Sequence, residues 1–232
     1  MSEDGDGQQR LHRNLPGTKA ADMWKWSARP FSDYDGPLAL SEYIQDLIRS
    51  KPSDIEKIYE LPSPEIDVLL WQYEHLRQFV LEFNLLLVAL AGECTVETCP
   101  KMTASNEWQY LCAAHRKPQD CAAIDYIRHT IEGSTALLTN RPRATRDPVA
   151  TRASGPGLEE VPSAKHCAKH FQSMSRRLYR IFAHVYFHHR ATFDWVEGKT
   201  RLCARFQHFV MRYQLMSRSM LLVPQESIEG TH

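Results

Sequence analysis

The strongest constraint on the fold of this chain is a pair of cysteines and a distant pair of histidines. Cys94 and Cys99 are separated by four residues, and so are His184 and His189, about 90 residues further along. A zinc ion without a redox role is normally held by four Cys or His side chains in a tetrahedron, which leaves no position for water or substrate. If these four residues share one metal, they join two distant parts of the chain in a structural site.

Closing such a site is energetically feasible. Bringing together pairs about 90 residues apart costs roughly 4–5 kcal/mol of chain entropy, whereas a structural zinc site contributes about 10–16 kcal/mol. The spacing matches none of the common compact zinc-finger patterns. Two buried thiols and three surface histidines, His184, His188 and His189, are therefore the alternative interpretation.

Helix geometry does not favour His189 as the fourth ligand. At about 100° per residue, His184 and His188 lie about 40° apart around a helix, whereas His184 and His189 lie about 140° apart. The i, i+4 pair fits an ideal helix. The i, i+5 pair requires a local distortion.

Two other groups of cysteines and histidines compete as ligand sets. Cys112 and His115 with Cys121 form one set, and His166 with His170 forms the other. Each lacks either a fourth ligand or a nearby cysteine pair, so we interpret both as packing or surface residues.

Length and composition favour one soluble domain. The chain has 232 residues, of which 43% are hydrophobic, and this is enough for one substantial core. Six cysteines without an N-terminal signal peptide predict a reducing, cytoplasmic setting with free or metal-bound thiols. We also consider peripheral association with the cytosolic face of internal membranes. The longest apolar run, Phe83 to Gly92, is too short to span a bilayer.

Charge is distributed unevenly along a chain whose formal net charge is zero. Residues 1–140 carry 13 Lys and Arg against 21 Asp and Glu, whereas residues 141–218 carry 15 against 5. The basic half suggests an anionic partner, such as nucleic acid, a membrane surface or a phosphorylated protein. Solvated surface arginines are the alternative.

Apolar periodicity predicts a mostly α-helical bundle. Residues 1–37 are expected to form an extended arm, 38–224 a single domain, and 225–232 a tail. The predicted helices cover Leu38 to Arg49, Ser63 to Ala91 with its apolar second half in the middle of the bundle, Ala122 to Leu138, Ser163 to Val196, and Thr200 to Met216. Glu107 to Ala113 predicts a strand or short β-hairpin, and 139–161 predicts a mobile surface loop.

Three arginines gather beside the apolar face of the second long helix. On a helical wheel Arg176, Arg177 and Arg180 fall within about 100° of arc. Guanidinium groups bind phosphate bidentately and stay charged at physiological pH, so this cluster suits recognition of a phosphorylated segment. A solvated basic helix face is the competing interpretation.

Enzymatic signatures are missing from the sequence. It contains no His-Glu-x-x-His, no Gly-x4-Gly-Lys and no Gly-x-Ser-x-Gly motif, which lowers the prospect of catalysis. A nucleic-acid-binding protein that uses the basic C-terminal half is the second hypothesis. A zinc hydrolase is the third, and it would require an open coordination position.

Several segments together resemble the Mob family of kinase-associated adaptors, and most closely its phocein branch. These segments are Cys94 to Cys99, Arg176 to His189, Arg13 to Ala20, Tyr73 to Phe79, Met102 to Ala104, Leu111 to His115, Ile124 to Thr130 and Phe209 to Met211. The loop at 139–161 departs from the phocein pattern.

The resemblance implies a non-catalytic adaptor built on a helical bundle with a structural zinc. It places the zinc ligands at Cys94, Cys99, His184 and His189, against the ideal-helix preference for His188, and a phosphopeptide pocket at Arg176, Arg177 and Arg180. Implied partners are a striatin-type scaffold, a type 2A phosphatase assembly, germinal-centre Ste20-like kinases and a phosphorylated protein segment. Nucleic acid is not among them.

Overall fold

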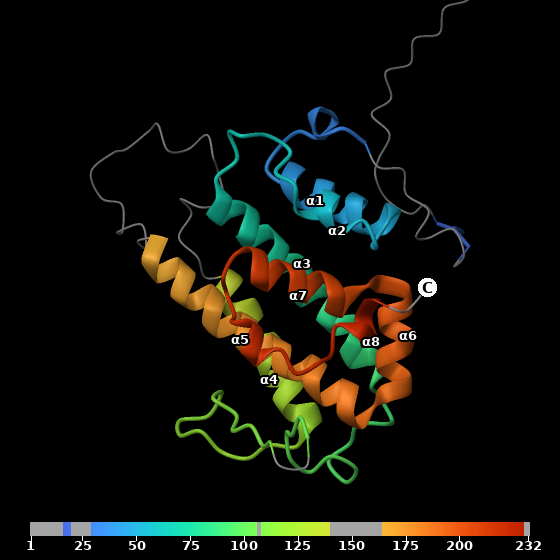
Figure 1. Ribbon diagram of the computed structural model, residues 1–232, viewed down its shortest axis with the longest axis vertical. Helices are drawn as coiled ribbons and strands as arrows, with labels where there is room; N and C mark the ends of the chain where they lie inside the picture. Colours follow the sequence, from blue (N-terminus) through green and yellow to red (C-terminus); the bar gives the residue numbers. More distant parts are fainter. Residues whose placement is uncertain (1–15, 20–28, 106–107, 140–163, 230–232) are drawn as a thin grey trace, which may run out of the picture.

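A bundle of α-helices forms the body of the molecule in a computed structural model, which describes residues 16–19, 29–105, 108–139 and 164–229 (Figure 1). The helices are α1 (Ala39–Ser50), α2 (Ile55–Tyr59), α3 (Val68–Ala89), α4 (Ala123–Thr139), α5 (Ala164–His188), α6 (Arg190–Thr200), α7 (Leu202–Arg212) and α8 (Glu226–Glu229), with short 3-10 turns η1 (Phe31–Asp33) and η4 (Arg218–Met220). This arrangement confirms the predicted helical fold class.

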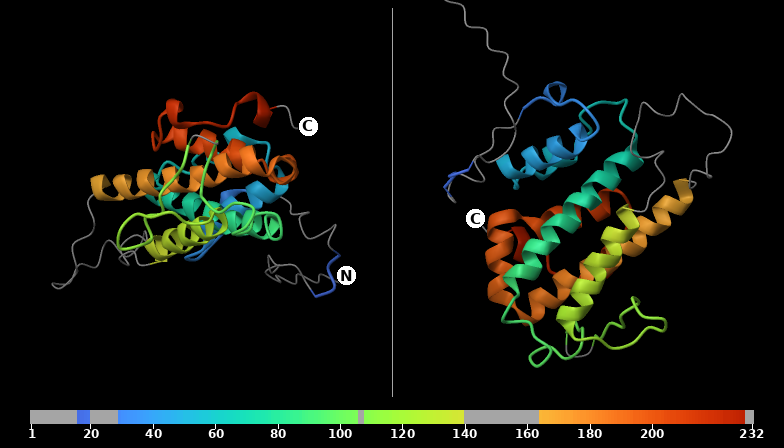
Figure 2. Two further views of the ribbon diagram at one scale, coloured as in Figure 1. Left: turned by 90° about the horizontal axis from the view of Figure 1, so that it is seen from below. Right: turned by 180° about the vertical axis from the view of Figure 1, so that it is seen from behind.

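Helix α3 lies at the centre of the bundle, in contact with α1, α4, α5 and α7. Seen from behind, it runs beside α4 and has α1 on its other side (Figure 2). Trp71, Phe79 and Phe83 of α3 are almost completely buried. Burying a large apolar side chain contributes about 1.5–3 kcal/mol, so these residues make α3 the main support of the fold.

Aromatic side chains join α3, α5 and α7 in one core. The ring of Phe83 lies 4.7 Å from that of Phe182 on α5, and Phe206 on α7 lies 5.4 Å from Phe182. Phe79 completes the cluster with a centroid distance of 4.9 Å to Phe206. Tilted and edge-on contacts at these distances are the favoured geometries of aromatic pairs.

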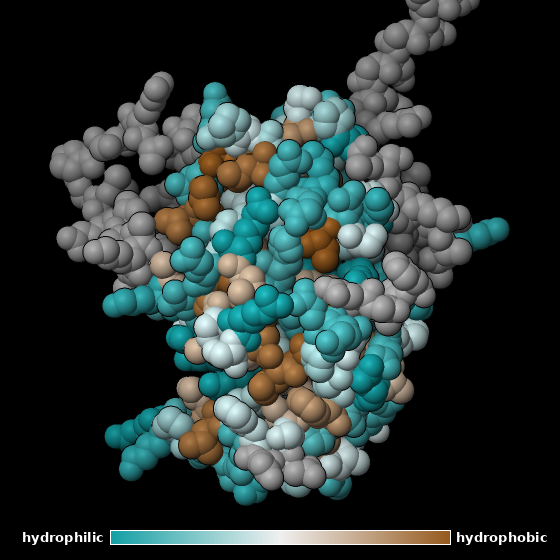
Figure 3. Space-filling view, viewed as in Figure 1, coloured by the Kyte–Doolittle hydropathy of each residue, from teal (hydrophilic) through white to brown (hydrophobic). Residues whose placement is uncertain are grey.

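The burial of α3 is less complete than its apolar sequence predicts. Leu81, Leu85 and Val88 are exposed by 54, 51 and 72%. Their spacing of four and three residues places them on one side of the helix, which no described element covers. Hydrophobic residues also reach the surface elsewhere, in separate patches on the face shown in Figure 3.

Some predicted helix boundaries are wrong. The first long helix begins at Val68 instead of Ser63, because Asp67 caps it by accepting a hydrogen bond from the Leu70 amide at 2.9 Å. A side-chain oxygen at this position satisfies an amide that has no partner within the helix. The predicted helix from Ser163 to Val196 is two helices, α5 and α6, which meet at His189.

The predicted strand or hairpin at 107–113 is reduced to isolated pairs of residues. In the described part of the segment, Thr103 pairs with Gln109 and Cys112 pairs with Gln119, and both pairs are antiparallel. The segment therefore forms folded loops between α3 and α4. The predicted loop at 139–161 lies, except for Thr139, outside the described residues.

The segment before α1 and the C-terminal helix both pack onto the bundle. Phe31 lies 5.3 Å from the ring of Tyr43 on α1, and Ile228 of α8 is buried. Trp24 and Trp26 of the predicted arm lie outside the described residues. None of the described helices is both long and apolar enough to cross a membrane.

Candidate metal centre and basic helix face

Cys94 and Cys99 lie in a series of tight turns directly after α3. Gly92 adopts a φ of +91°, a left-handed conformation that glycine tolerates and that commonly ends a helix. The Thr98 hydroxyl donates to the Glu93 carbonyl at 2.8 Å, and the Cys99 amide donates to the Thr95 carbonyl at 2.9 Å. These bonds position both thiols on one side of the turn.

The two histidines lie on either side of the break between α5 and α6. His184 is completely buried on α5, and its Nδ1 lies 2.8 Å from the Thr103 carbonyl. His189 has φ −135° and ψ 54°, outside the helical region. This is the local distortion that an i, i+5 ligand pair requires.

His188, in contrast, does not join the cluster of Cys94, Cys99, His184 and His189. It is exposed on the last turn of α5, and its Nε2 lies 2.9 Å from the Thr103 hydroxyl. An ideal helix would favour His188, but α5 ends at this residue. His189 then turns toward the cysteines.

The four predicted ligands converge in the structure. Cys94 Sγ lies 3.6 Å from His184 Nε2, and Cys99 Sγ lies 3.4 Å from His189 Nε2. All four ligand atoms lie within 4.8 Å of one another. Tetrahedral zinc with Zn–S of about 2.3 Å and Zn–N of about 2.0–2.1 Å separates sulfur from nitrogen by about 3.6 Å, so this donor set fits a zinc ion.

Burial shifts the pKa values of His184 and Cys94 in this cluster. It lowers the pKa of His184 to about 4, an effect that the hydrogen bond to the Thr103 backbone partly offsets. It raises the pKa of Cys94 to about 12, and the nearby Cys99 thiol adds to the rise. The neutral imidazole is the form that binds metal, and the buried thiolate needs a cation to stabilise it.

The three predicted arginines occupy one face of α5, but they differ in exposure. Arg176 and Arg177 are exposed, whereas Arg180 is partly buried. Arg180 donates to the Tyr126 hydroxyl at 3.0 Å and lies over the Tyr110 ring at 4.8 Å. Arg180 therefore connects α5 to α4 and to the loops before it.

A cleft lies beside this basic face. Arg177 lines it from α5, and Tyr126, His129, Thr130, Gly133, Ala136 and Leu137 line it from α4, with Cys112, Ala113 and Ala114 completing the wall. An arginine therefore stands at the edge of a mostly small and apolar surface. Such a surface can accept an extended segment whose anionic group reaches the arginine.

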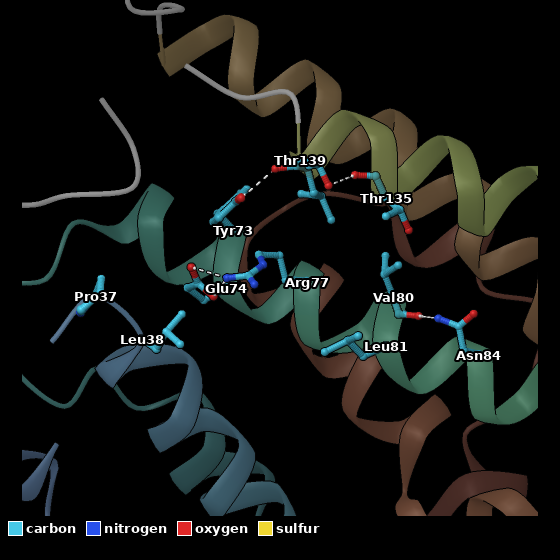
Figure 4. A pocket seen from close by; sticks show the side chains of 11 residues that line it. Pro37, Leu38, Tyr73, Glu74, Arg77, Val80, Leu81, Asn84, Thr135 and Thr139 are labelled. Carbon is cyan, nitrogen blue, oxygen red and sulfur yellow. Dashed lines mark hydrogen bonds and ion pairs between the residues drawn. The ribbon is translucent and has the colours of Figure 1, made fainter. Parts of the chain in front are cut away.

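A second cleft lies between α3 and α4 and is shown in Figure 4. Among the residues that line it, the charged groups are Glu74 and Arg77, and their side chains pair with each other at 2.8 Å. Tyr73 donates to the Leu138 carbonyl at 2.7 Å. Because these polar groups are already paired, this cleft is a weaker candidate for binding phosphate or metal.

The interpretation of Cys112, His115 and Cys121 as lacking a fourth ligand is wrong. His129, from the second turn of α4, brings its ligand atom to within 4.8 Å of theirs. The sequence signal that could have found it was a histidine eight residues after Cys121. The other competing set, His166 and His170, stays a prediction, because the side chain of His166 lies outside those that the structure describes.

The fold and the side-chain clusters define a class of helical protein that has two clusters of cysteine and histidine and a basic helix face. The model of the Mob1/phocein family matches residues 46–224. The chain is 45% identical over 219 residues to "MOB kinase activator-like 4" of Drosophila melanogaster, which covers 94% of this chain and 92% of that protein. It is 42% identical over 214 residues to "MOB-like protein phocein" of Caenorhabditis elegans, covering 92% and 90%.

A more distant match is "Maintenance of ploidy protein mob1" of Schizosaccharomyces pombe, 27% identical over 174 residues, or 74% of this chain and 76% of that protein. The chain belongs to the Mob1/phocein family. The family model covers α3 to α7 and therefore both Cys/His clusters and all three arginines. The resemblance inferred from the sequence is thereby confirmed.

Proposed function

We propose that this protein is a non-catalytic adaptor of kinase regulation, stabilised by zinc at Cys94, Cys99, His184 and His189. The fit of this donor set to tetrahedral zinc supports the metal. Four protein ligands leave no coordination position for a substrate, so the proposed role of the metal is structural. Membership of the Mob1/phocein family supports the adaptor role.

The ligand that we propose is a phosphorylated segment of a partner protein. The observation that carries this proposal is the placement of Arg176 and Arg177, exposed on α5, with Arg180 one turn further along. A guanidinium has five N–H donors, so Arg180 keeps donors for a phosphate after its bond to Tyr126. The cleft beside Arg177 would receive the residues that flank the phosphate.

The metal and the basic face are mechanically linked in this proposal. Arg180 and His184 are four residues apart on α5, which places them about 6 Å apart along the helix axis. A zinc ion that holds His184 would therefore also fix the position of the arginines. The proposal predicts weaker phosphopeptide binding when the metal is removed.

The partners that we propose follow from the likeness to phocein. They are a striatin-type scaffold, a type 2A phosphatase assembly and germinal-centre Ste20-like kinases. We propose that the protein binds them in the cytoplasm. The similarity to the relatives named phocein and kinase activator-like 4 supports this proposal. Quantified co-purification with these partners from cells, compared between wild type and an arginine variant, tests it.

A peptide-binding assay tests the phosphate site directly. Fluorescence anisotropy with matched phosphorylated and unphosphorylated kinase peptides should show preference for the phosphorylated form. The Arg176→Ala/Arg177→Ala variant should bind it roughly 10- to 100-fold more weakly, because hydrogen bonds to charged groups contribute about 1.5–3 kcal/mol. Arg190→Ala is the matched control, since Arg190 is exposed on α6 and pairs with Asp194 at 2.8 Å.

Equal affinity for the two peptides, or no loss in the double arginine variant, would overturn the phosphate proposal. Neither result would bear on the zinc proposal, which is tested by metal content. Equally tight binding of generic duplex DNA, with steep salt dependence, would instead favour the nucleic-acid hypothesis.

A further inference from the structure

The second Cys/His cluster gathers four ligand atoms from one short stretch of the chain, residues 112–129. Cys112 Sγ lies 3.5 Å from His129 Nδ1, and His115 Nε2 lies 2.9 Å from Cys121 Sγ. The rings of His115 and His129 are 5.0 Å apart and nearly perpendicular. All four ligand atoms lie within 4.8 Å of one another, as they do in the first cluster.

Backbone hydrogen bonds hold the two cysteines of this cluster in place. The Cys112 amide donates to the Gln119 carbonyl at 2.7 Å, and the Gln119 amide donates back at 3.2 Å, which closes a loop over residues 113–118. The Met102 amide donates to the Cys121 carbonyl at 3.0 Å. The loop thus returns Cys121 to the side of Cys112 and places His115 at its tip.

The fourth residue comes from a rigid element. His129 lies on α4, whose neighbouring residues Tyr126, Ile127 and Thr130 are buried against the bundle. A ligand on a packed helix is positioned more precisely than one on a loop. Residues 113–118 are exposed except for His115, which is partly buried, so a bond from His115 to a shared metal would fasten this loop to α4.

The donor set has the chemistry of a zinc site. Two thiolates and two imidazoles select a borderline-soft ion that prefers a tetrahedron. Tetrahedral zinc separates sulfur from nitrogen by about 3.6 Å, close to the 3.5 Å between Cys112 and His129. The 2.9 Å between His115 and Cys121 would widen by about 0.7 Å, a movement that an exposed loop tip can make.

We propose that Cys112, His115, Cys121 and His129 bind a second zinc ion, which holds the loop at 113–118 against α4. The spacing, with two, five and seven residues between successive ligands, is compact enough to close without long-range folding. This site is separate from the first, whose ligands come from the turn after α3 and from the junction of α5 and α6.

A consequence follows for the cleft beside the basic face. Cys112 and His129 line the same cleft as Arg177. The second zinc would therefore stabilise one wall of the cleft, while the first positions the helix that carries the arginine. Loss of the second metal should change the position of the loop at 113–118 and leave the helical core intact.

Metal counting on the full-length protein, purified under reducing conditions, tests the proposal. Elemental analysis should find two zinc ions per chain in the wild type and one in Cys112→Ser/Cys121→Ser. Cys94→Ser/Cys99→Ser removes the other ion. Lys117→Ala is the matched control, because Lys117 is exposed in the same loop and supplies no ligand atom, and it should keep both ions.

Cobalt titration of the wild-type chain gives a second measurement that does not depend on a variant folding. The absorption bands of tetrahedral Co²⁺ bound to thiolate should increase up to two equivalents. Saturation at one equivalent, or two zinc ions retained by Cys112→Ser/Cys121→Ser, would overturn the proposal. So would a Cys112–Cys121 disulfide, seen as a mass deficit of two hydrogens in the protein purified under reducing conditions.

Discussion

A single hydrogen bond decides which nitrogen of His184 faces the cysteines. The Nδ1–H group donates to the Thr103 carbonyl at 2.8 Å, so the unprotonated Nε2 is directed at Cys94. Metal-binding histidines commonly donate their other N–H to a carbonyl in this way, which fixes the tautomer and the ring orientation. Thr103 belongs to the loops after α3, and these loops therefore orient the ring of His184.

The pair His188 and His189 gives a sharp test of the first site. We expect the His189→Ala variant to lose its zinc to a competing chelator at a chelator concentration at which the His188→Ala variant keeps its zinc. The reason is that His189, and not His188, has a ring nitrogen beside the Cys99 sulfur. The two variants remove the same side chain at adjacent positions, so each is the control for the other. Zinc loss from His188→Ala with retention in His189→Ala would contradict the assignment.

His75 makes the stability of the protein depend on pH. Its ring is buried among Trp71, Tyr59 and Phe209, with centroid distances of 4.4, 4.8 and 5.6 Å. Burial, with a smaller effect from the Arg205 charge, lowers its pKa well below 6.5. The unfolded chain therefore takes up a proton near pH 6.5 that the folded protein does not, and stability falls as the pH falls below that value.

We expect His75→Phe to remove this component. As the pH falls from about 6.5 to 5, the free energy of unfolding should fall faster in the wild type than in the variant. The difference between the two slopes should approach about 1.4 kcal/mol per pH unit. Urea denaturation at a series of pH values measures both slopes. Acid release of zinc affects the two proteins alike, so parallel slopes would show that His75 is not the titrating group.

At the scale of elements, a buried ion pair joins α3 to α7. Arg205 of α7 is fully buried, and its Nη1 donates to Glu82 of α3 at 3.1 Å, while its Nη2 bonds the other carboxylate oxygen. Its Nε donates to the Thr200 carbonyl at 3.0 Å. These bonds satisfy a charge that would be costly to bury alone.

Glu82→Ala should lower the free energy of unfolding by about 3–5 kcal/mol, because it leaves the Arg205 guanidinium buried without its partner. Glu82→Leu/Arg205→Met should cost less than the single change, since it removes both charges together. Urea denaturation of the three proteins measures the difference. If the double variant is less stable than Glu82→Ala, the ion pair contributes more to the free energy of unfolding than the burial of its two charges costs.

Exposed ion pairs give the comparison for this prediction. Arg190 and Asp194 are both about half exposed on α6, and Asp194→Ala should change stability by less than about 1 kcal/mol.

Helices could be predicted from periodicity, but their interruptions could not. The predicted apolar face of α5 is confirmed at Leu178, Ile181 and Val185, which are all fully buried. The end of that helix at His188 was missed, because no proline or glycine marks it. Helix α2 has only five residues, too few for a periodic signal.

At the scale of the whole molecule, the first zinc site would close a long loop of chain. Its ligand pairs lie 90 residues apart, and most of the helical core is folded between them. A metal that binds only the folded state stabilises it by about 2.7 kcal/mol when its free concentration is 100 times the dissociation constant. The stability of the entire bundle should therefore depend on zinc.

Chelation under reducing conditions should lower the melting temperature of the wild type, and added zinc should restore it. Calorimetry with and without chelator measures the shift. Cys94→Ser/Cys99→Ser should already melt at the lower temperature and respond less to chelator. An unchanged melting temperature in the wild type would mean that the fold does not depend on the metal.

The approach of Cys94 and Cys99 to His184 and His189 could be predicted from sequence, because these residues come as two spaced pairs in segments that resemble a known family. The second set could not, since its fourth member, His129, lies within an ordinary helical pattern. Its approach to Cys112 depends on how the loops before α4 fold back. The cleft beside Arg177 could not be predicted either, because its walls come from three separate segments: α4, α5 and the loop that begins at Cys112.

The break at His189 limits how this part of the chain can change in length. His184 and His189 face the same cysteine turn only because four residues and one non-helical junction separate them. An inserted residue would turn the second histidine by about 100° around α5 and carry it away from Cys99. The number of residues between these two positions is therefore constrained by the turn they must face, in addition to the packing that constrains the buried Val185.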